Sequence, residues 1–136
     1  MKLKTNLSAL VKKAQKGETF IITSRASLSR EATAIMTNET IEIVVSAASA
    51  WEIATKVRLG KLPEGKALEQ RFVEALNEIG YTLLPIDAQT TLRAGRLTPD
   101  HGDPFDRMIA AQALALDIPV ISKNAKLDQF GVRRIW

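Results

Sequence analysis

The chain has 136 residues, of which 46% are hydrophobic, 25% are charged and none is cysteine. This length and composition suit one globular domain with a single core, and they exclude disulfides and thiolate metal sites. The net charge is +4, but residues 1–24 contain five lysines against one glutamate and the rest is balanced, so net charge does not mark the body as a nucleic-acid binder.

A helix and a short strand are expected at the amino end. Five apolar residues recur there at helical spacing, which predicts one apolar stripe: Leu3, Leu7, Leu10, Val11 and Ala14. Gly17 ends this helix, and residues 19–23 follow as a β-rich segment. The pair is too small to bury its own apolar face, so we expect it to dock on the body of the chain.

The rest of the chain alternates strands with helices. Strands are expected over 41–45, 81–86, 118–122 and 132–135, and helices over 30–36, 47–59, 67–79, 88–97 and from Pro104 onward. This alternation predicts a three-layer α/β/α fold with a mainly parallel central sheet. No apolar run is long enough to span a bilayer, and the amino terminus lacks a signal-peptide pattern, so we expect no membrane association and a cytoplasmic protein.

Glu52 is the first candidate functional residue. It lies about one turn into the helix that follows the buried strand 41–45, near the sheet edge at which parallel α/β proteins usually bind ligands. An alternative is local: Ser49 and Glu52 fit the Ser-x-x-Glu capping box, in which the glutamate only satisfies a backbone donor.

Three further residues are expected at the same edge. Asp103 and Asp106 begin the helix from Pro104, and Asn124 follows the strand 118–122. Clustered carboxylates repel one another unless a cation neutralises them, and hard oxygen ligands suit Mg²⁺ or Mn²⁺, which can activate water for phosphodiester hydrolysis. Asp103 and Asp106 also fit helix capping, and the two roles can coexist.

Two long motifs resemble VapC-type toxins of the PIN-domain family. Residues 44–61 carry Val-Ser-Ala-Ala-Ser-x-Trp-Glu-Ile-Ala-x-Lys-x-x-Leu-Gly-Lys, and residues 103–113 carry Asp-Pro-Phe-Asp-Arg-x-x-x-Ala-Gln-Ala. With Val-Ile-Ser at 120–122 and the ending at 130–136, the resemblance extends over about residues 27–136. It implies a Mg²⁺-dependent endoribonuclease of toxin–antitoxin modules, usually a homodimer, with acidic residues lining a groove for RNA.

The resemblance implies four acidic site positions, and this chain has an acidic residue at two of them. Glu52 matches the second acid of the family and Asp106 the third, with Asp103 as a supporting acid. The first acid should end an opening strand, yet the chain has no aspartate before Asp87, and Asn124 stands at the fourth position without a charge. We therefore expect weak binding of Mg²⁺ or Mn²⁺ by Glu52, Asp106, Asp103 and Asn124.

The opening of the chain resembles a different family. Lys-Thr-Asn-Leu-Ser-Ala-Leu at 4–10 and Gly-Glu-Thr-Phe-Ile-Ile-Thr at 17–23 are similar to the start of Phd/YefM-type antitoxins. This implies an antitoxin-like segment over residues 1–24 and a PIN-like domain over 25–136 that lacks its usual first strand. Residues 19–23 are expected to fill the vacant place in the sheet, which puts Thr23 or Ser24 where the first aspartate should be.

Two main functions remain open from the sequence. The first is a nuclease in which Glu52 and Asp106 hold a divalent ion, supported by Asp103 and Asn124, with RNA as substrate. The second is a non-catalytic remnant that dimerises and binds an antitoxin or nucleic acid; the absent aspartate favours it. DNA binding through residues 2–16 is weaker, because one short helix lacks the rest of a dimeric DNA-binding fold.

Overall fold

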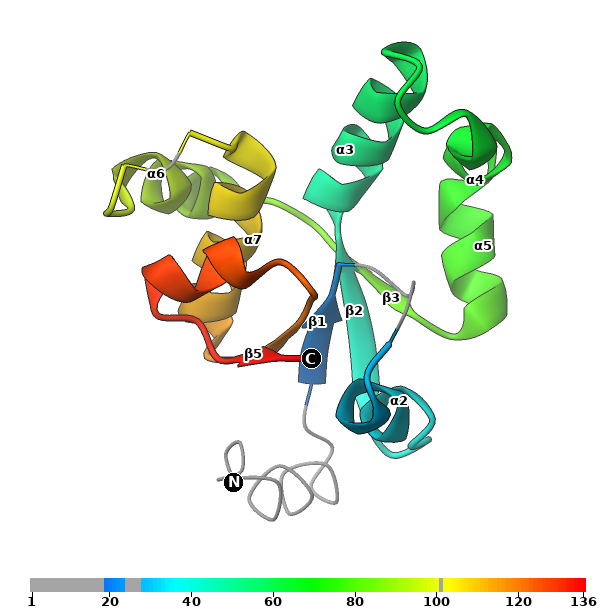
Figure 1. Ribbon diagram of the computed structural model, residues 1–136, viewed down its shortest axis with the longest axis horizontal. Helices are drawn as coiled ribbons and strands as arrows, with labels where there is room; N and C mark the ends of the chain where they lie inside the picture. Colours follow the sequence, from blue (N-terminus) through cyan, green and yellow to red (C-terminus); the bar gives the residue numbers. More distant parts are fainter. Residues whose placement is uncertain (1–18, 24–27, 101) are drawn as a thin grey trace.

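The computed structural model describes residues 19–23, 28–100 and 102–136 (Figure 1). The helix expected over residues 3–14 and the candidate Ser24 lie outside these ranges. Within them, five strands form one parallel sheet in the order β3-β2-β1-β4-β5. The strands are β1 (Thr19–Ile22), β2 (Glu42–Ser46), β3 (Thr82–Leu84), β4 (Val120–Ile121) and β5 (Arg134–Ile135).

Helices cover both faces of this sheet. They are α2 (Arg30–Met36), α3 (Ala47–Arg58), α4 (Lys66–Gln70), α5 (Phe72–Ile79), α6 (Ala88–Arg96) and α7 (Pro104–Leu116), with short 3₁₀ helices η1 (Pro63–Gly65) and η2 (Ala125–Phe130). Successive strand residues face opposite sides: Phe20 packs in one apolar cluster with α2 and α5, and Ile21 packs in a second with α7. The predicted three-layer α/β/α fold is confirmed.

β1 is the central strand of the sheet. Ile21 is level with Val44 of β2 on one side and Val120 of β4 on the other, and both Phe20 and Ile21 are fully buried. The expected pairing of this segment within the main sheet is therefore confirmed. As a result, Thr23 emerges at the carboxyl edge, where its backbone N–H donates to the carbonyl of Ile121 at 3.1 Å.

The strands expected over 118–122 and 132–135 shorten to Val120–Ile121 and Arg134–Ile135, and two further elements differ from their sequence expectation for a local reason. The helix expected over 67–79 divides into α4 and α5, because Arg71 leaves the helical region with φ −127° and ψ 32°. The strand expected over 81–86 ends at Leu84, since Pro85 has no N–H to donate to a neighbouring strand. None of the helices in the described ranges is long and apolar enough to cross a membrane.

Candidate functional site

Glu52 lies in the second turn of α3. This helix begins at Ala47, because Ser46 caps it by accepting a 3.0 Å hydrogen bond from the N–H of Ala48. Ser49 is therefore inside the helix, so the Ser49–Glu52 capping box is wrong. Glu52 is free of that local role, and its side chain is 26% exposed.

Asp103 and Asp106 have different positions at the start of α7. Asp103 is the N-cap: its Oδ1 accepts from the N–H of Phe105 at 2.8 Å and from that of Asp106 at 3.2 Å. The capping interpretation is correct for this residue. Asp106 lies in the first turn and is 9% exposed, so most of its surface is enclosed by the protein.

One pocket at the carboxyl edge of the sheet brings four distant segments together. Glu52 from α3, Asp106 from α7 and Asn124 from the loop after β4 line it, and Thr23 lines it after β1. The pocket has a volume of about 390 Å³. Asp103 is not among the lining residues. The convergence of the Glu52 and Asp106 helices on one cleft, which the sequence predicted, is thus present.

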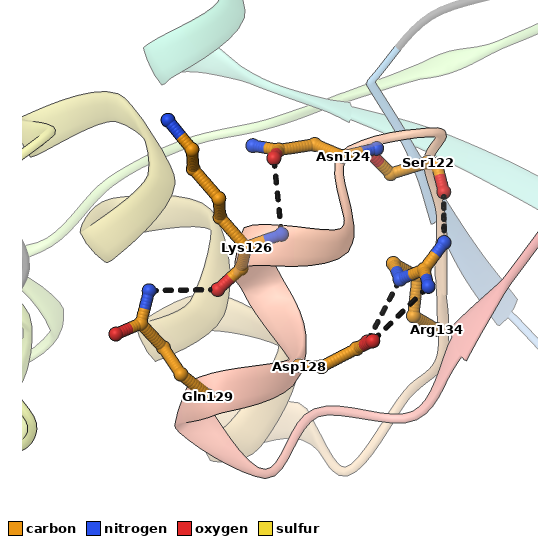
Figure 2. A network of polar contacts seen from close by, with 6 residues as sticks. All are labelled: Ser122, Asn124, Lys126, Asp128, Gln129 and Arg134. Atoms are coloured by element: carbon orange, nitrogen blue, oxygen red, sulfur yellow. Dashed lines mark hydrogen bonds and ion pairs between the residues drawn. The ribbon is translucent and has the colours of Figure 1, made fainter.

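A polar network fixes the Asn124 loop (Figure 2). The side chain of Asn124 caps η2, with its Oδ1 accepting from the N–H of Lys126 at 3.1 Å, and its own N–H donates to Ser122 Oγ at 3.1 Å. Arg134 then joins this loop to β5, because its guanidinium donates to the Ser122 carbonyl at 3.2 Å and to both carboxylate oxygens of Asp128. The amide oxygen of Asn124 is therefore already engaged within its own loop.

Two lysines give the pocket a balanced charge. Lys56 Nζ lies 2.8 Å from Glu52 Oε2, one helical turn away on α3, and Lys123 lines the pocket from the loop after β4. The lining therefore contains two ammonium groups and two carboxylates. Lys56 is within the motif that suggested the site, whereas no sequence pattern singled out Lys123, whose place depends on how the β4 loop folds.

Arg107, next to Asp106, does not line the pocket and has a structural role. Its guanidinium donates to the carbonyls of Ala94, Gly95 and Leu97 at 3.0, 3.2 and 2.8 Å. These carbonyls belong to the carboxyl end of α6 and the loop after it, where a helix leaves its last acceptors unsatisfied. Arg107 thus anchors α6 to the first turn of α7, the turn that also carries Asp106.

The donor set does not fit the divalent ion that the sequence resemblance implies. In the parts of the chain that the structure describes, no three His, Cys, Asp or Glu side chains are grouped so that they could hold a metal ion. The pocket supplies two carboxylates, of which Glu52 already contacts an ammonium group, and an amide oxygen that caps η2. Mg²⁺ dehydrates reluctantly and demands near-ideal octahedral geometry, so a lining in which one of two carboxylates and the amide oxygen are already engaged is a poor site for it.

The comparison with known families agrees with the fold and the pocket. The sequence model described as PIN domain matches residues 13–132, which include β1 and extend through all four segments of the pocket. No curated protein matches the chain. PIN domains are a family of nucleases often present in toxin–antitoxin systems, and they generally use divalent metal ions.

Proposed function

This chain belongs to the PIN domain family, and from that premise we propose that it is a VapC-like toxin–antitoxin protein whose endoribonuclease activity is weakened or lost. The motifs at 44–61 and 103–113 support the VapC type, and they place Glu52 and Asp106 on the two helices that meet at the pocket. RNA is the substrate of any remaining activity.

The observation that supports weakened activity is the residue at the end of β1. Thr23, which brings no charge, lines the same pocket as Glu52 and Asp106, at the position where the resemblance to VapC-type toxins implies an aspartate. Lys56 and Lys123 balance the two remaining carboxylates. Without an excess of negative charge, the pocket has little to offset the dehydration of Mg²⁺ or Mn²⁺, so we expect weak metal binding.

An RNA cleavage assay tests this function. Purified protein is incubated with RNAs of varied sequence and structure in the presence of Mg²⁺ or Mn²⁺, beside the double variant Glu52→Gln, Asp106→Asn. We expect slow cleavage by the parent or none, and none by the variant. Rapid cleavage by the parent that the double substitution abolishes would reject the loss of activity and leave the nuclease assignment standing.

A non-catalytic role is the second candidate, and the Glu52–Lys56 ion pair favours it. A pocket that holds its own counter-ions keeps its fold without a metal, so the chain could serve as a module that dimerises and binds an antitoxin or nucleic acid. Trp51, which is 54% exposed and packs edge-on against Phe105, offers an aromatic surface for a homodimer. Light scattering of the purified chain distinguishes a dimer from a monomer.

We also propose that residues 1–24 are a Phd/YefM-like segment joined to a PIN-like domain over residues 25–136. The support is the central position of β1: a strand from the antitoxin-like segment completes the sheet between β2 and β4. Deletion of residues 1–24 should therefore abolish folding, because it leaves the facing edges of β2 and β4 without hydrogen-bond partners. A folded deletion variant, seen by circular dichroism, would contradict this arrangement.

A further inference from the structure

One face of α6 carries a line of polar side chains beside a hollow in the surface. Gln89, Arg93 and Arg96 are spaced by four and three residues, which places them on the same side of the helix. Together with Thr90 and with Ala115 of α7 they line a hollow of about 330 Å³. Within the described ranges no acidic residue lines it, so the hollow is positively charged.

The two arginines of this hollow are available for a ligand. Both residues are exposed, and the arginines that form ion pairs in the described part of the chain are others, namely Arg71, Arg133 and Arg134. A guanidinium group carries five N–H donors in a planar arrangement that matches the oxygens of an anion in pairs. Two such groups one helical turn apart therefore form a site for an anion.

The carboxyl end of α6 does not depend on these arginines. Both Arg93 and Arg96 lie in the last turn, where basic side chains often donate to the terminal carbonyls of a helix. Here the carbonyls of Ala94 and Leu97 accept from the guanidinium of Arg107 on α7. Another arginine thus serves the helix end, which leaves the α6 pair for binding.

The same contact joins the arginine hollow to the candidate site. Arg107 follows Asp106, so its 2.8 Å hydrogen bond to the Leu97 carbonyl holds the end of α6 beside the turn of α7 that reaches the pocket. The two helices lie side by side (Figure 1). One extended anionic polymer can therefore contact both Arg96 and the pocket.

We propose that the face formed by Gln89, Arg93 and Arg96 binds the phosphate backbone of RNA. This inference rests on the proposed function, in which RNA is the substrate or ligand, and it adds a binding site separate from the carboxylate pocket. Arginine and glutamine side chains donate to phosphate oxygens in nucleic-acid complexes, and such contacts position a strand without reading its sequence. The arginines supply the positive charge that the balanced pocket lacks.

The lining favours RNA over an acidic segment of a protein. Among its described residues only Ala115 is apolar. Interfaces between proteins have an apolar, often aromatic, centre, whereas interfaces with nucleic acids are more polar and much more positively charged. The composition of the hollow matches the second kind.

Fluorescence anisotropy with a labelled single-stranded RNA of mixed sequence tests the proposal. The full-length chain is titrated in EDTA, so that no divalent ion supports cleavage, at several salt concentrations. The test protein carries Arg93→Gln and Arg96→Gln, and a second variant carries lysine at both positions. The charge-matched control carries Arg30→Gln on α2 and Lys66→Gln on α4, two exposed residues outside the hollow.

We expect the glutamine pair to weaken RNA binding by about tenfold or more and to lower the slope of log K against log salt concentration by about 1.4, since two phosphate contacts are lost. The control pair should change both quantities much less. The lysine pair should keep the slope of the parent, because an ammonium group also binds phosphate as a point charge. Thermal melts followed by circular dichroism should coincide, and Arg93→Gln alone, with about half the change in slope, decides the matter if the double variant is unstable.

A glutamine pair with the affinity and salt slope of the parent would overturn the proposal, as would an equal loss in the control pair or a parent that binds no RNA. Poly-glutamate that binds the parent more tightly than RNA, and loses this affinity in the glutamine pair, would assign the face to an acidic protein segment instead. Full displacement of RNA by millimolar inorganic phosphate at constant ionic strength would show a site for free phosphate. None of these results involves cleavage, so the cleavage assay still decides the proposed function.

Discussion

Ser46 and Gln112, which are 66 residues apart in the sequence, share a buried hydrogen bond between Ser46 Oγ and Gln112 Oε1. Ser46 caps α3, and Gln112 lies in α7, where its Nε2 also donates to the carbonyl of Pro85 at 3.2 Å. This contact joins the two helices that carry Glu52 and Asp106. The contact therefore fixes the position of one side of the pocket relative to the other.

Gln112→Met is expected to destabilise the fold by about 1–3 kcal/mol, because Ser46 and the Pro85 carbonyl lose a buried partner while the volume is nearly kept. Thermal or urea unfolding measures the change. Gln89→Ala, on the exposed side of α6, is the control and should alter the free energy of unfolding by less than about 0.5 kcal/mol. A Gln112→Met protein as stable as the parent would show that the buried bond contributes nothing.

Lys56→Met is expected to raise Mn²⁺ affinity with little effect on stability. Its pair with Glu52 is an exposed i,i+4 contact, which is worth about 0.3–0.5 kcal/mol, so the free energy of unfolding should change by no more than that. Removing the ammonium group leaves Glu52 available and makes the pocket more negative. Isothermal titration with Mn²⁺ measures the affinity, and Arg58→Met, which removes a charge from the same helix outside the lining, is the control.

Arg107→Lys is expected to lower stability by about 1–2 kcal/mol even though the charge is kept. A single ammonium group cannot reproduce the planar guanidinium that reaches the carbonyls of Ala94, Gly95 and Leu97 together. Hydrogen exchange should locate the loss at the carboxyl end of α6. Exchange rates there equal to those of the parent would contradict this anchoring role.

Asp128→Asn is expected to reduce stability in a pH-dependent way. Hydrogen bonds from Arg134 lower the pKa of the Asp128 carboxyl. A carboxyl with a lowered pKa in the folded state stabilises the protein above its unfolded pKa of about 3.9, and this contribution disappears as the pH falls through the folded pKa. The variant should be less stable than the parent at pH 7, by no more than about 1 kcal/mol for a pair this exposed, and equal to it near pH 2.

Unfolding curves from pH 2 to pH 7 measure this difference. Asp117→Asn is the control, because Asp117 is 92% exposed and contacts Arg133 through one oxygen at 3.2 Å. It should show a smaller change over the same range. A difference between parent and Asp128→Asn that stays constant from pH 7 to pH 2 would show that the carboxyl charge is not involved.

Local sequence patterns were enough to predict much of the fold. The remaining features depend on long-range contacts and could not be predicted from these patterns. The caps at Ser29, Asp87 and Asp103 and the helix α2 were predictable because each depends on residues within one turn. The break at Arg71 was not, since apolar spacing is continuous through it. The start of α3 was assigned correctly, yet the competing capping box at Ser49 could be rejected only once Ser46 was seen to cap the helix.

The residues of the candidate site also divide into those that could be predicted from the sequence and those that could not. Glu52 and Asp106 were identifiable because parallel strands direct their following segments to one edge. Thr23 followed from placing residues 19–23 in the vacant strand position. Gln112 stands in the motif at 103–113, but its buried contact with Ser46 depends on how α7 packs, and the position of Lys123 depends on how the β4 loop folds, so neither could be predicted from a local pattern.

The most direct test of a charge-poor pocket is the Mn²⁺ affinity of Thr23→Asp beside that of Thr23→Asn, measured by isothermal titration. A unit charge about 4 Å from a cation contributes a few kcal/mol at the effective dielectric near a protein surface, so we expect the aspartate to bind Mn²⁺ at least about tenfold more tightly than the parent, and the asparagine to match the parent. Tight binding by the parent that Glu52→Gln abolishes, or equal affinities for the aspartate and asparagine variants, would contradict the account.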